Sequence, residues 1–178
     1  MEPRYRTSAQ ILHWLIALLV IGLLTVGLIL RYDLIAKSSR PTVLMLHMSI
    51  GLTVFFLMLL RLGVRLVSPV PPLPASVTAP IRLVAGATQI LFYILLLAMP
   101  VFGVIFVQAH GFKVPYFDLF TLPALVAKNQ PLNHWFAFLH FWGGITLIVL
   151  LVLHVAGAIR HQLRGERVLL RMMPRRSR

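Results

Sequence analysis

The chain contains no cysteine and only four acidic residues among its 178 residues. Without cysteine it can form no disulfide, bind no iron–sulfur cluster and use no thiolate in catalysis. The acids, none of which lies in a long apolar stretch, are Glu2, Asp33, Asp118 and Glu166. Their positions argue against a buried carboxylate metal site and against a proton relay built from aspartate and glutamate.

Charged residues of both signs are scarce, at 12% of the sequence, whereas hydrophobic residues make up 59%. A soluble domain carries about 25% charged residues. So small a protein cannot bury this much apolar surface inside itself, and lipid is therefore its expected solvent. The formal net charge of +13 is one signature of nucleic-acid binding. Here the basic residues flank apolar runs, and this pattern favours a membrane surface and no nucleic acid.

Four apolar stretches are long enough to cross a bilayer, which takes roughly 20 residues. They predict an all-α integral membrane protein, with residues 1–178 forming a single bundle of four transmembrane helices. We expect these helices at about 9–31, 42–66, 81–108 and 133–162. The first stretch is longer than the apolar part of a signal peptide and no small-residue cleavage site follows it, so we interpret it as a retained helix.

Prolines and basic residues predict the connections and the orientation. A proline-rich segment at 67–80 is expected to be an extended linker, and Pro100 should kink the third helix. The loop at 108–133 mixes aromatic residues with prolines and is expected near the membrane interface. Twelve lysines and arginines lie at the end of the bundle that holds both termini, and five at the other. Because cytoplasmic loops carry the excess, both termini are predicted to be cytoplasmic.

Four of the seven histidines fall inside the predicted helices, at His13, His47, His140 and His154. Ionisable residues in a membrane are costly and are candidates for function, although a neutral histidine can also simply bond to a neighbouring helix. His140 and His154 are 14 residues apart, which is about 40° short of four turns and roughly 21 Å along one helix face. His13 should lie at the depth of His154, and His47 at that of His140, which gives two pairs.

A pair of facing imidazoles suits the iron of a b-type haem, whereas zinc or copper would need three or four ligands together. A small residue follows each histidine by four positions and would leave room for a flat porphyrin, although such residues are common where transmembrane helices touch. These residues are Ala17, Gly51, Gly144 and Ala158. His134 is a poorer ligand, because six residues before His140 it lies on another face.

Several segments over nearly the whole chain resemble the bacterial cytochrome b561 family. They are LHWL at 12–15, PTVLMLHMSIG at 41–51, RLGVRL at 61–66, FYILLLAMPVFG at 92–103, HWFAFLHFWGG at 134–144 and HVAGAIRHQLRGERVLLRMMP at 154–174. The resemblance implies a bacterial inner-membrane protein with two haems b. His13 and His154 would ligate the cytoplasmic haem iron, and His47 and His140 the periplasmic one.

The resemblance also implies exchange of electrons between a quinone pool and a partner across the membrane. The chain also resembles short enterobacterial members with superoxide oxidase activity, and this resemblance implies that periplasmic superoxide would be oxidised to oxygen and ubiquinone reduced. Many members carry a histidine four residues before a tyrosine of the third helix. This chain has Gln89 before Tyr93, and we expect these two residues to bond across helices rather than to ligate iron.

Several further residues are candidates for sites around the haems. His161 lies two turns after His154, and the resemblance places it near a quinone site. There it would exchange a proton with a quinone oxygen, because histidine titrates near neutral pH, or it simply meets lipid headgroups. Trp14 either lines the same pocket or marks the membrane interface. Arg61 and Arg65 either pair with haem propionates or only add to the cytoplasmic excess of positive charge.

On the outer side, a cluster of cations either attracts an anion such as superoxide or contacts lipid headgroups. Its members are Arg31, Lys37, Arg40 and Lys113. Two other functions remain as alternatives. The chain could be the haem-bearing membrane anchor that passes electrons between quinone and a periplasmic redox partner. It could also be a small transporter or channel without a cofactor, which the lack of acids within the spans disfavours.

Overall fold

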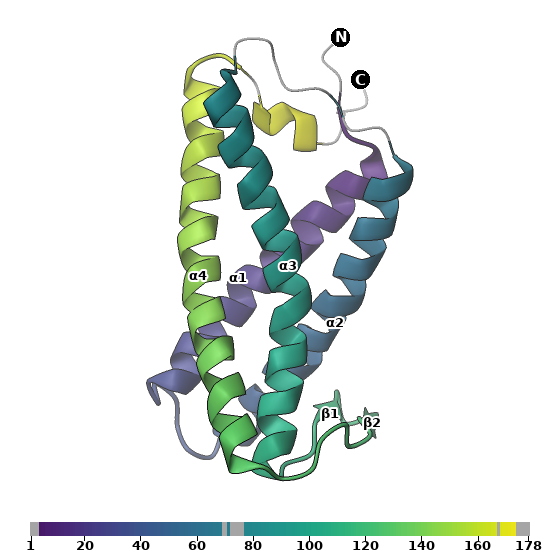
Figure 1. The fold of residues 1–178 in the computed structure, drawn as a ribbon, viewed down its shortest axis with the longest axis vertical. Helices are drawn as coiled ribbons and strands as arrows, with labels where there is room; N and C mark the ends of the chain where they lie inside the picture. Colours follow the sequence, from purple (N-terminus) through teal and green to yellow (C-terminus); the bar gives the residue numbers. More distant parts are fainter. Residues whose placement is uncertain (1–3, 69–70, 72–76, 167, 174–178) are drawn as a thin grey trace.

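The computed structural model describes residues 4–68, 71, 77–166 and 168–173. Four long helices dominate this described part of the chain: α1 Thr7–Arg31, α2 Arg40–Val67, α3 Ala79–His110 and α4 Gln130–Leu163 (Figure 1). Each is long and apolar enough to cross a membrane, so the predicted four-helix membrane fold is confirmed. Some predicted features lie outside the described residues, namely the linker prolines Pro69, Pro72 and Pro74 and the arginines Arg167, Arg175, Arg176 and Arg178.

All four helices begin two or three residues earlier than the sequence predicts. Pro41, Pro80 and Pro131 lie in the first turns of α2, α3 and α4, where a missing N–H breaks no helical hydrogen bond. The side chain of Asn129 caps α4 by accepting a hydrogen bond from the Leu132 N–H at 3.0 Å. The third helix continues through Pro100 and ends before Gly111. Proline therefore sets where these helices start and does not interrupt α3.

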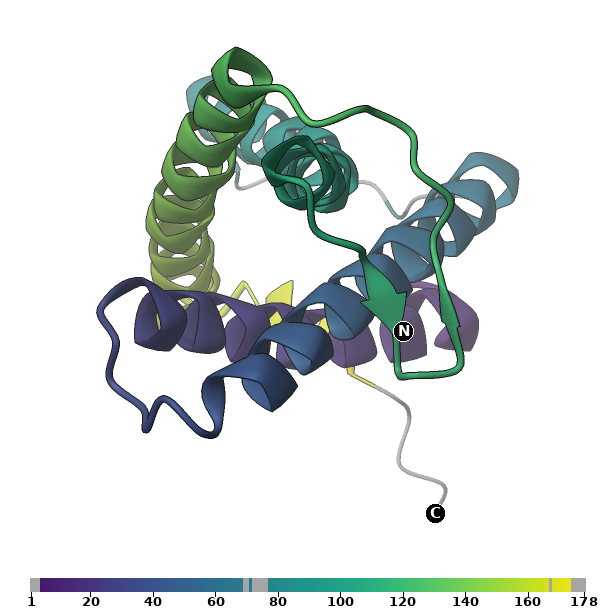
Figure 2. The same ribbon diagram turned by 90° about the horizontal axis from the view of Figure 1, so that it is seen from below.

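Successive helices run in opposite directions, so α1 begins at the end of the bundle where α4 finishes (Figure 1). We call this the inner end, after the predicted orientation, and the opposite end the outer end. α3 packs along α4, α1 along α2, and α2 along α3, whereas α1 and α4 touch at few places (Figure 2). A central cluster joins all four helices, with Ile16, Val54, Leu96 and Leu147 among its members.

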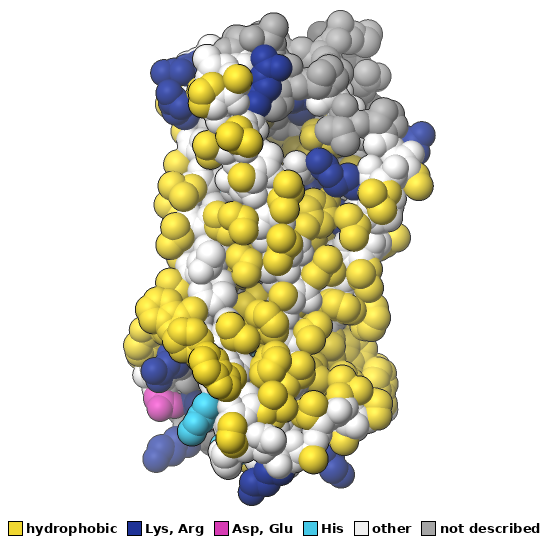
Figure 3. Space-filling view, viewed as in Figure 1, with side chains coloured by type: hydrophobic (Ala, Val, Ile, Leu, Met, Phe, Trp, Pro, Cys, Tyr) yellow, Lys and Arg dark blue, Asp and Glu magenta, His cyan; other side chains and the backbone are white. Residues whose placement is uncertain are grey.

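The outward surface of the bundle is apolar over most of its length. Leu18 of α1 is 70% exposed, and Phe56 of α2 and Ile90 of α3 are each 61% exposed. On the face shown in Figure 3, apolar side chains cover the middle, and lysine and arginine side chains gather at the two ends. Exposed apolar surface of this extent is unfavourable in water and suits lipid.

A short hairpin, which the sequence did not predict, interrupts the loop between α3 and α4. Its strands, β1 Pro115–Tyr116 and β2 Phe120–Thr121, pair in antiparallel register. The hairpin is attached to α2, because the N–H of Phe117 donates to the fully buried hydroxyl oxygen of Ser49 at 2.8 Å. Thr53 and Tyr116 add a hydroxyl–hydroxyl bond of 3.2 Å. The hairpin thus covers the side of α2 two residues beyond His47.

The chain after α4 returns to the start of α1. A short 3₁₀ helix, η1 Val168–Met172, lies at the inner end (Figure 1). The side-chain amide of Gln10 donates to the carbonyl of Arg171 at 3.2 Å, and the indole N–H of Trp14 donates to the carbonyl of Met172 at 2.8 Å. Gln10 and Trp14 flank His13 on α1, so the C-terminal segment is held beside that histidine.

Candidate functional site

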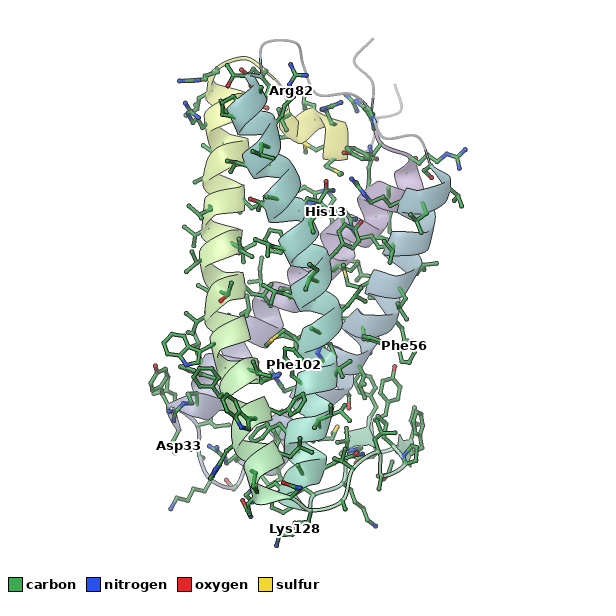
Figure 4. All side chains as sticks on the ribbon, in the orientation of Figure 1. His13, Asp33, Phe56, Arg82, Phe102 and Lys128 are labelled. Atoms are coloured by element: carbon green, nitrogen blue, oxygen red, sulfur yellow. The ribbon has the colours of Figure 1, made fainter. Side chains whose placement is uncertain are left out.

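The four histidines within the helices meet in two facing pairs. The ring centres of His13 on α1 and His154 on α4 are 6.3 Å apart, with planes inclined by 75°. Those of His47 on α2 and His140 on α4 are 6.2 Å apart, at 74°. Figure 4 shows His13 toward the inner end, whereas Phe102 of α3 lies toward the outer end. Phe102 precedes Gly103, which lies against His140 of the second pair. The pairs therefore occupy opposite halves of the bundle.

The spacing of each pair fits one metal ion bound between two imidazoles. Metal–imidazole bonds are about 2 Å long, so two bonds and half of each ring span about 6 Å. Among the described residues, no group of three or more histidine, cysteine or acidic side chains could hold a metal ion. Two protein ligands leave the other coordination positions to a planar macrocycle, as in a bis-histidine haem.

The packing of the helices leaves α4 separated from the helices that carry its partner histidines. α4 packs closely on α3 but makes few contacts with α1. His154 is exposed, and the other three histidines are only half-buried. A neutral histidine serving only as packing would normally be enclosed and hydrogen-bonded. The open faces of these rings instead suit a flat ligand inserted between the helices.

Two glycines that sequence analysis did not single out lie directly against the outer pair. A Cβ at Gly103 of α3 would be 3.1 Å from Cε1 of His140 and 3.4 Å from its Nδ1, and a Cβ at Gly27 of α1 would be 3.6 Å from Cε1 of His47. By contrast, a Cβ at Gly51 would meet no other described side chain within 4 Å. The sequence indicated small residues beside the ligands, but these two come from neighbouring helices.

The outer pair has an asymmetric hydrogen-bond environment. Nδ1 of His140 lies 3.1 Å from the carbonyl oxygen of Met99, so this nitrogen carries the hydrogen and donates it. Nε2 of His140 is then free to ligate a metal, because a hydrogen bond at one ring nitrogen of a histidine leaves the other nitrogen to bind the metal. Nδ1 of His47 is buried and has no hydrogen-bond partner among the described residues.

Aromatic and cationic side chains surround the inner pair. Trp14 lies edge-on to His13 at 5.3 Å, and Phe92 lies edge-on to His154 at 5.6 Å. Arg61 of α2 lies within electrostatic range of both histidines, and its guanidinium donates to the carbonyl of Ala9 at 2.9 Å. The inner pair therefore sits beside a fixed positive charge.

Gln89 of α3 is bonded across helices. The guanidinium of Arg65 donates to the side-chain oxygen of Gln89 at 3.0 Å and lies 5.9 Å from the ring centre of Tyr93. Gln89 therefore connects α3 to α2 through Arg65. It is engaged in this contact and contributes no third imidazole to the inner pair.

Comparison with known proteins agrees with this geometry. The family model described as prokaryotic cytochrome b561 matches residues 4–175. This chain belongs to the prokaryotic cytochrome b561 family. It is 33% identical over 162 residues to a cytochrome b561 homolog 2 of Escherichia coli, covering 89% of this chain and 84% of that protein.

Other relatives cover almost the whole chain. A cytochrome b561 homolog 1 of Escherichia coli is 30% identical over 98% of this chain and 99% of its own length. A probable superoxide oxidase of Yersinia pestis is 26% identical over 99% of both chains. Membership of the cytochrome b561 family makes the chain a haem b-binding protein of membrane electron transfer in bacteria.

The cations predicted at the outer end of this cytochrome b561 protein are only partly free of contacts. The guanidinium of Arg31 lies 5.4 Å from the ring centre of Phe141 and so joins α1 to α4. Arg40 forms an ion pair with Asp33, which offsets its charge. Lys37 and Lys113 are exposed. The outer end keeps a surplus of positive charge, to which Arg40 contributes less than the sequence suggested.

At the inner end, His161 has a partner that sequence analysis missed. Its Nδ1 is bonded to the carboxylate of Glu166, although the acids were expected to take no part in a relay because none lies in an apolar run. Gly165 precedes Glu166 and adopts φ +77°, which turns the chain back toward the helix. A glycine at the C-terminus of a helix followed by an acid is the signal that could have indicated this contact.

Proposed function

We propose that this cytochrome b561 protein holds two haems b and passes electrons from a donor at the outer end to a quinone at the inner end. The two facing histidine pairs, which share α4, are the single observation that supports this most strongly. The excess of lysine and arginine at the inner end supports an orientation with both termini in the cytoplasm. The outer end would then face the periplasm.

Each pair would hold one haem iron. His47 and His140 would form the outer site, and His13 and His154 the inner site, where Arg61 and Arg65 would pair with haem propionates. The haems would supply one-electron transfer and temporary storage of electrons. The protein contributes by fixing the ligand rings, as Met99 does for His140, and by placing positive charge beside the inner pair. A positive charge there favours the reduced state of a nearby redox centre.

Superoxide is the proposed donor. Five lysines and arginines against two acids lie in the outer segments, and a cationic surface raises the arrival rate of an anion. A full-length relative is described as a probable superoxide oxidase. The exposed Lys37 and Lys113, with Arg31 and the partly neutralised Arg40, would form this surface.

Ubiquinone is the proposed acceptor, at the inner end near His161 and Trp14. His161 lies two helical turns beyond His154, which is about 10 Å along the axis of α4. Trp14 lies against His13 and holds the C-terminal segment. These residues would bind the quinone head group beside the inner haem, and His161 would exchange a proton with one of its oxygens.

Rapid-mixing absorbance spectroscopy of the purified, haem-loaded protein tests this function. The oxidised protein should be reduced by superoxide, and the reduced protein reoxidised by ubiquinone, each within the mixing experiment. Haem analysis should give two haems b per chain. Failure to react with superoxide, together with rapid reduction by a co-purifying periplasmic subunit, would instead identify the chain as the membrane anchor of a larger dehydrogenase. Ion flux by a haem-free protein would contradict both.

A further inference from the structure

The contact between His161 and Glu166 is built by the way α4 ends. The N–H groups of Arg164 and Gly165 donate to the carbonyls of Arg160 and Gln162, each at 3.1 Å. After the left-handed turn at Gly165, the N–H of Glu166 donates to the carbonyl of His161 at 3.1 Å. The backbone of Glu166 thus bonds to the backbone of His161, and this brings the carboxylate of Glu166 directly to the His161 imidazole.

The pair is shielded although it lies at the end of a helix. The side chain of His161 is 17% exposed and that of Glu166 is 15% exposed. Exposed ion pairs contribute little to stability, whereas a carboxylate on one ring nitrogen of a shielded histidine fixes its tautomer and the orientation of the ring. The other ring nitrogen, Nε2, is then the one available to a further ligand.

The position of the pair relates it to the inner histidine pair. His161 follows His154 by seven residues, so the two side chains share one face of α4. The described acids of the chain are Asp33, Asp118 and Glu166, and Asp33 pairs with Arg40 at the outer end. Asp118 lies in the hairpin turn and is exposed. Glu166 is therefore the described acid that lies near the proposed quinone site.

We propose that Glu166 is a positioning residue for His161. The carboxylate of Glu166 accepts the Nδ1 hydrogen of the His161 imidazole and so directs Nε2 of that ring toward a quinone oxygen. This inference rests on the proposed quinone reaction at the inner end and adds to it the residue that orients the proton donor. The contact, its shielding and its place on the face of His154 carry the inference.

Reduction of a quinone to a quinol takes up two electrons, which membrane electron transfer supplies, and two protons. In each proton transfer the Nε2–H bond of protonated His161 breaks and an O–H bond forms on the quinone. His161 then regains a proton from water at the inner end before the next transfer. The Nδ1 hydrogen stays on His161 throughout, and the carboxylate of Glu166 accepts a hydrogen bond from it without losing or gaining a proton.

Four variants of the haem-loaded protein test the proposal. Glu166→Leu removes the acceptor with little change in volume, whereas Glu166→Gln keeps an acceptor oxygen and removes the charge. His161→Gln removes the proton donor. Asp118→Asn is the matched control, because it removes one acid at the opposite end of the bundle. Thermal unfolding and the haem content of each variant show whether the fold is intact.

Reoxidation of the reduced protein by ubiquinone, followed through haem oxidation, is the kinetic measurement. Glu166→Leu should lower kcat about 10–100-fold, the usual effect of losing an orienting partner, and should change KM for ubiquinone much less. Glu166→Gln should retain more of the rate than Glu166→Leu. Adding Glu166→Leu to His161→Gln should lower the rate no further, because the positioned group is already absent. Asp118→Asn should behave as wild type.

A spectroscopic measurement separates orientation from general stability. In reduced protein labelled with ¹⁵N-histidine, the signals that His161→Gln removes should show hydrogen on Nδ1 in the wild type. In Glu166→Leu they should shift toward the other tautomer. A merely structural contact would instead lower the unfolding temperature and haem content while leaving kcat per haem unchanged, and this result would overturn the proposal.

The remaining outcomes distinguish the inference from the function on which it rests. Losses that multiply in the double variant would show that Glu166 acts independently of His161, which overturns the inference and leaves the quinone reaction standing. A wild-type rate in His161→Gln would place the quinone site elsewhere and overturn the inference with it. No reaction between the reduced wild-type protein and ubiquinone would refute the proposed function itself.

Discussion

Gly103 is the glycine whose added Cβ would lie nearest to a histidine of the proposed outer haem site. A Cβ there would lie 3.1 Å from Cε1 of His140 and 3.4 Å from its Nδ1. Ordinary contacts between carbon atoms are about 3.5–4.0 Å, so the imidazole of a Gly103→Ala variant must move by about 0.5 Å. Met99 lies one helical turn from Gly103 on the same helix, and the ring therefore moves away from both residues.

The movement weakens a specific hydrogen bond. Nδ1 of His140 is 3.1 Å from the Met99 carbonyl oxygen, near the upper end of the range for N–H···O bonds, about 2.7–3.2 Å. A shift of about half an ångström breaks it. Overpacking costs about 1–3 kcal/mol, and the better helix propensity of alanine offsets about 0.5–1 kcal/mol. At about 1.4 kcal/mol per factor of ten, the net cost of about 0–2.5 kcal/mol predicts up to roughly 60-fold weaker binding of the outer haem.

We would measure the haem content of the purified variant and the potential of each haem by redox titration. Gly103→Ala should lose part of one haem, with the other retained at its wild-type potential. Gly27→Ala is a graded control, since its Cβ would make an ordinary contact of 3.6 Å with His47. Gly22→Ala is the blank, because its Cβ would meet no other described atom within 4 Å. Full content and unchanged potentials in Gly103→Ala, or equal losses in all three variants, would refute the reasoning.

Three further variants test the pairing, the porphyrin space and the hairpin. His47→Ala should remove the outer haem and spare the inner one, and His154→Ala should do the reverse; haem analysis showing equal loss of both in either variant would contradict pairing by depth. Gly51→Ala should lower haem content even though its Cβ meets no described side chain, and a normal content would show that no porphyrin occupies that space. Ser49→Ala leaves the Phe117 N–H without its buried acceptor and should destabilise the protein by about 1–3 kcal/mol in thermal unfolding.

Much of the fold could be predicted because each helix signals itself locally. An apolar run of about 20 residues has one stable form in a bilayer, since a helix satisfies its own backbone hydrogen bonds. The sequence predicts starts for α2, α3 and α4 that are too late, because Pro41, Pro80 and Pro131 are as typical of loops as of first helical turns. The hairpin was missed because strands of two residues, such as Pro115–Tyr116, are too short to show an alternating pattern.

The candidate site was predictable as far as the two histidine pairs, which follow from helix direction, depth and the spacing of residues along one helix. That His140 and His154 lie on one face of α4 follows from the 14 residues between them. The contact of Gly103 with His140 depends on how α3 is rotated against α4, and an apolar face directed at lipid carries no signal of that rotation. The contact of Glu166 depends on one left-handed residue, Gly165, beyond the end of α4. Contacts that depend on helix rotation and on a terminal turn required the three-dimensional structure.

The two proposed haem sites follow from one feature of the topology. His13 is the seventh residue of α1 and His47 the eighth of α2, and because these helices run in opposite directions their histidines lie at opposite ends of the bundle. α4 faces both, with His140 and His154 about ten residues from its two ends. The 14 residues between them fix the separation of the sites at roughly 21 Å. A straight α4 therefore determines how far an electron must travel, whereas α1 and α2 determine the environment of each site.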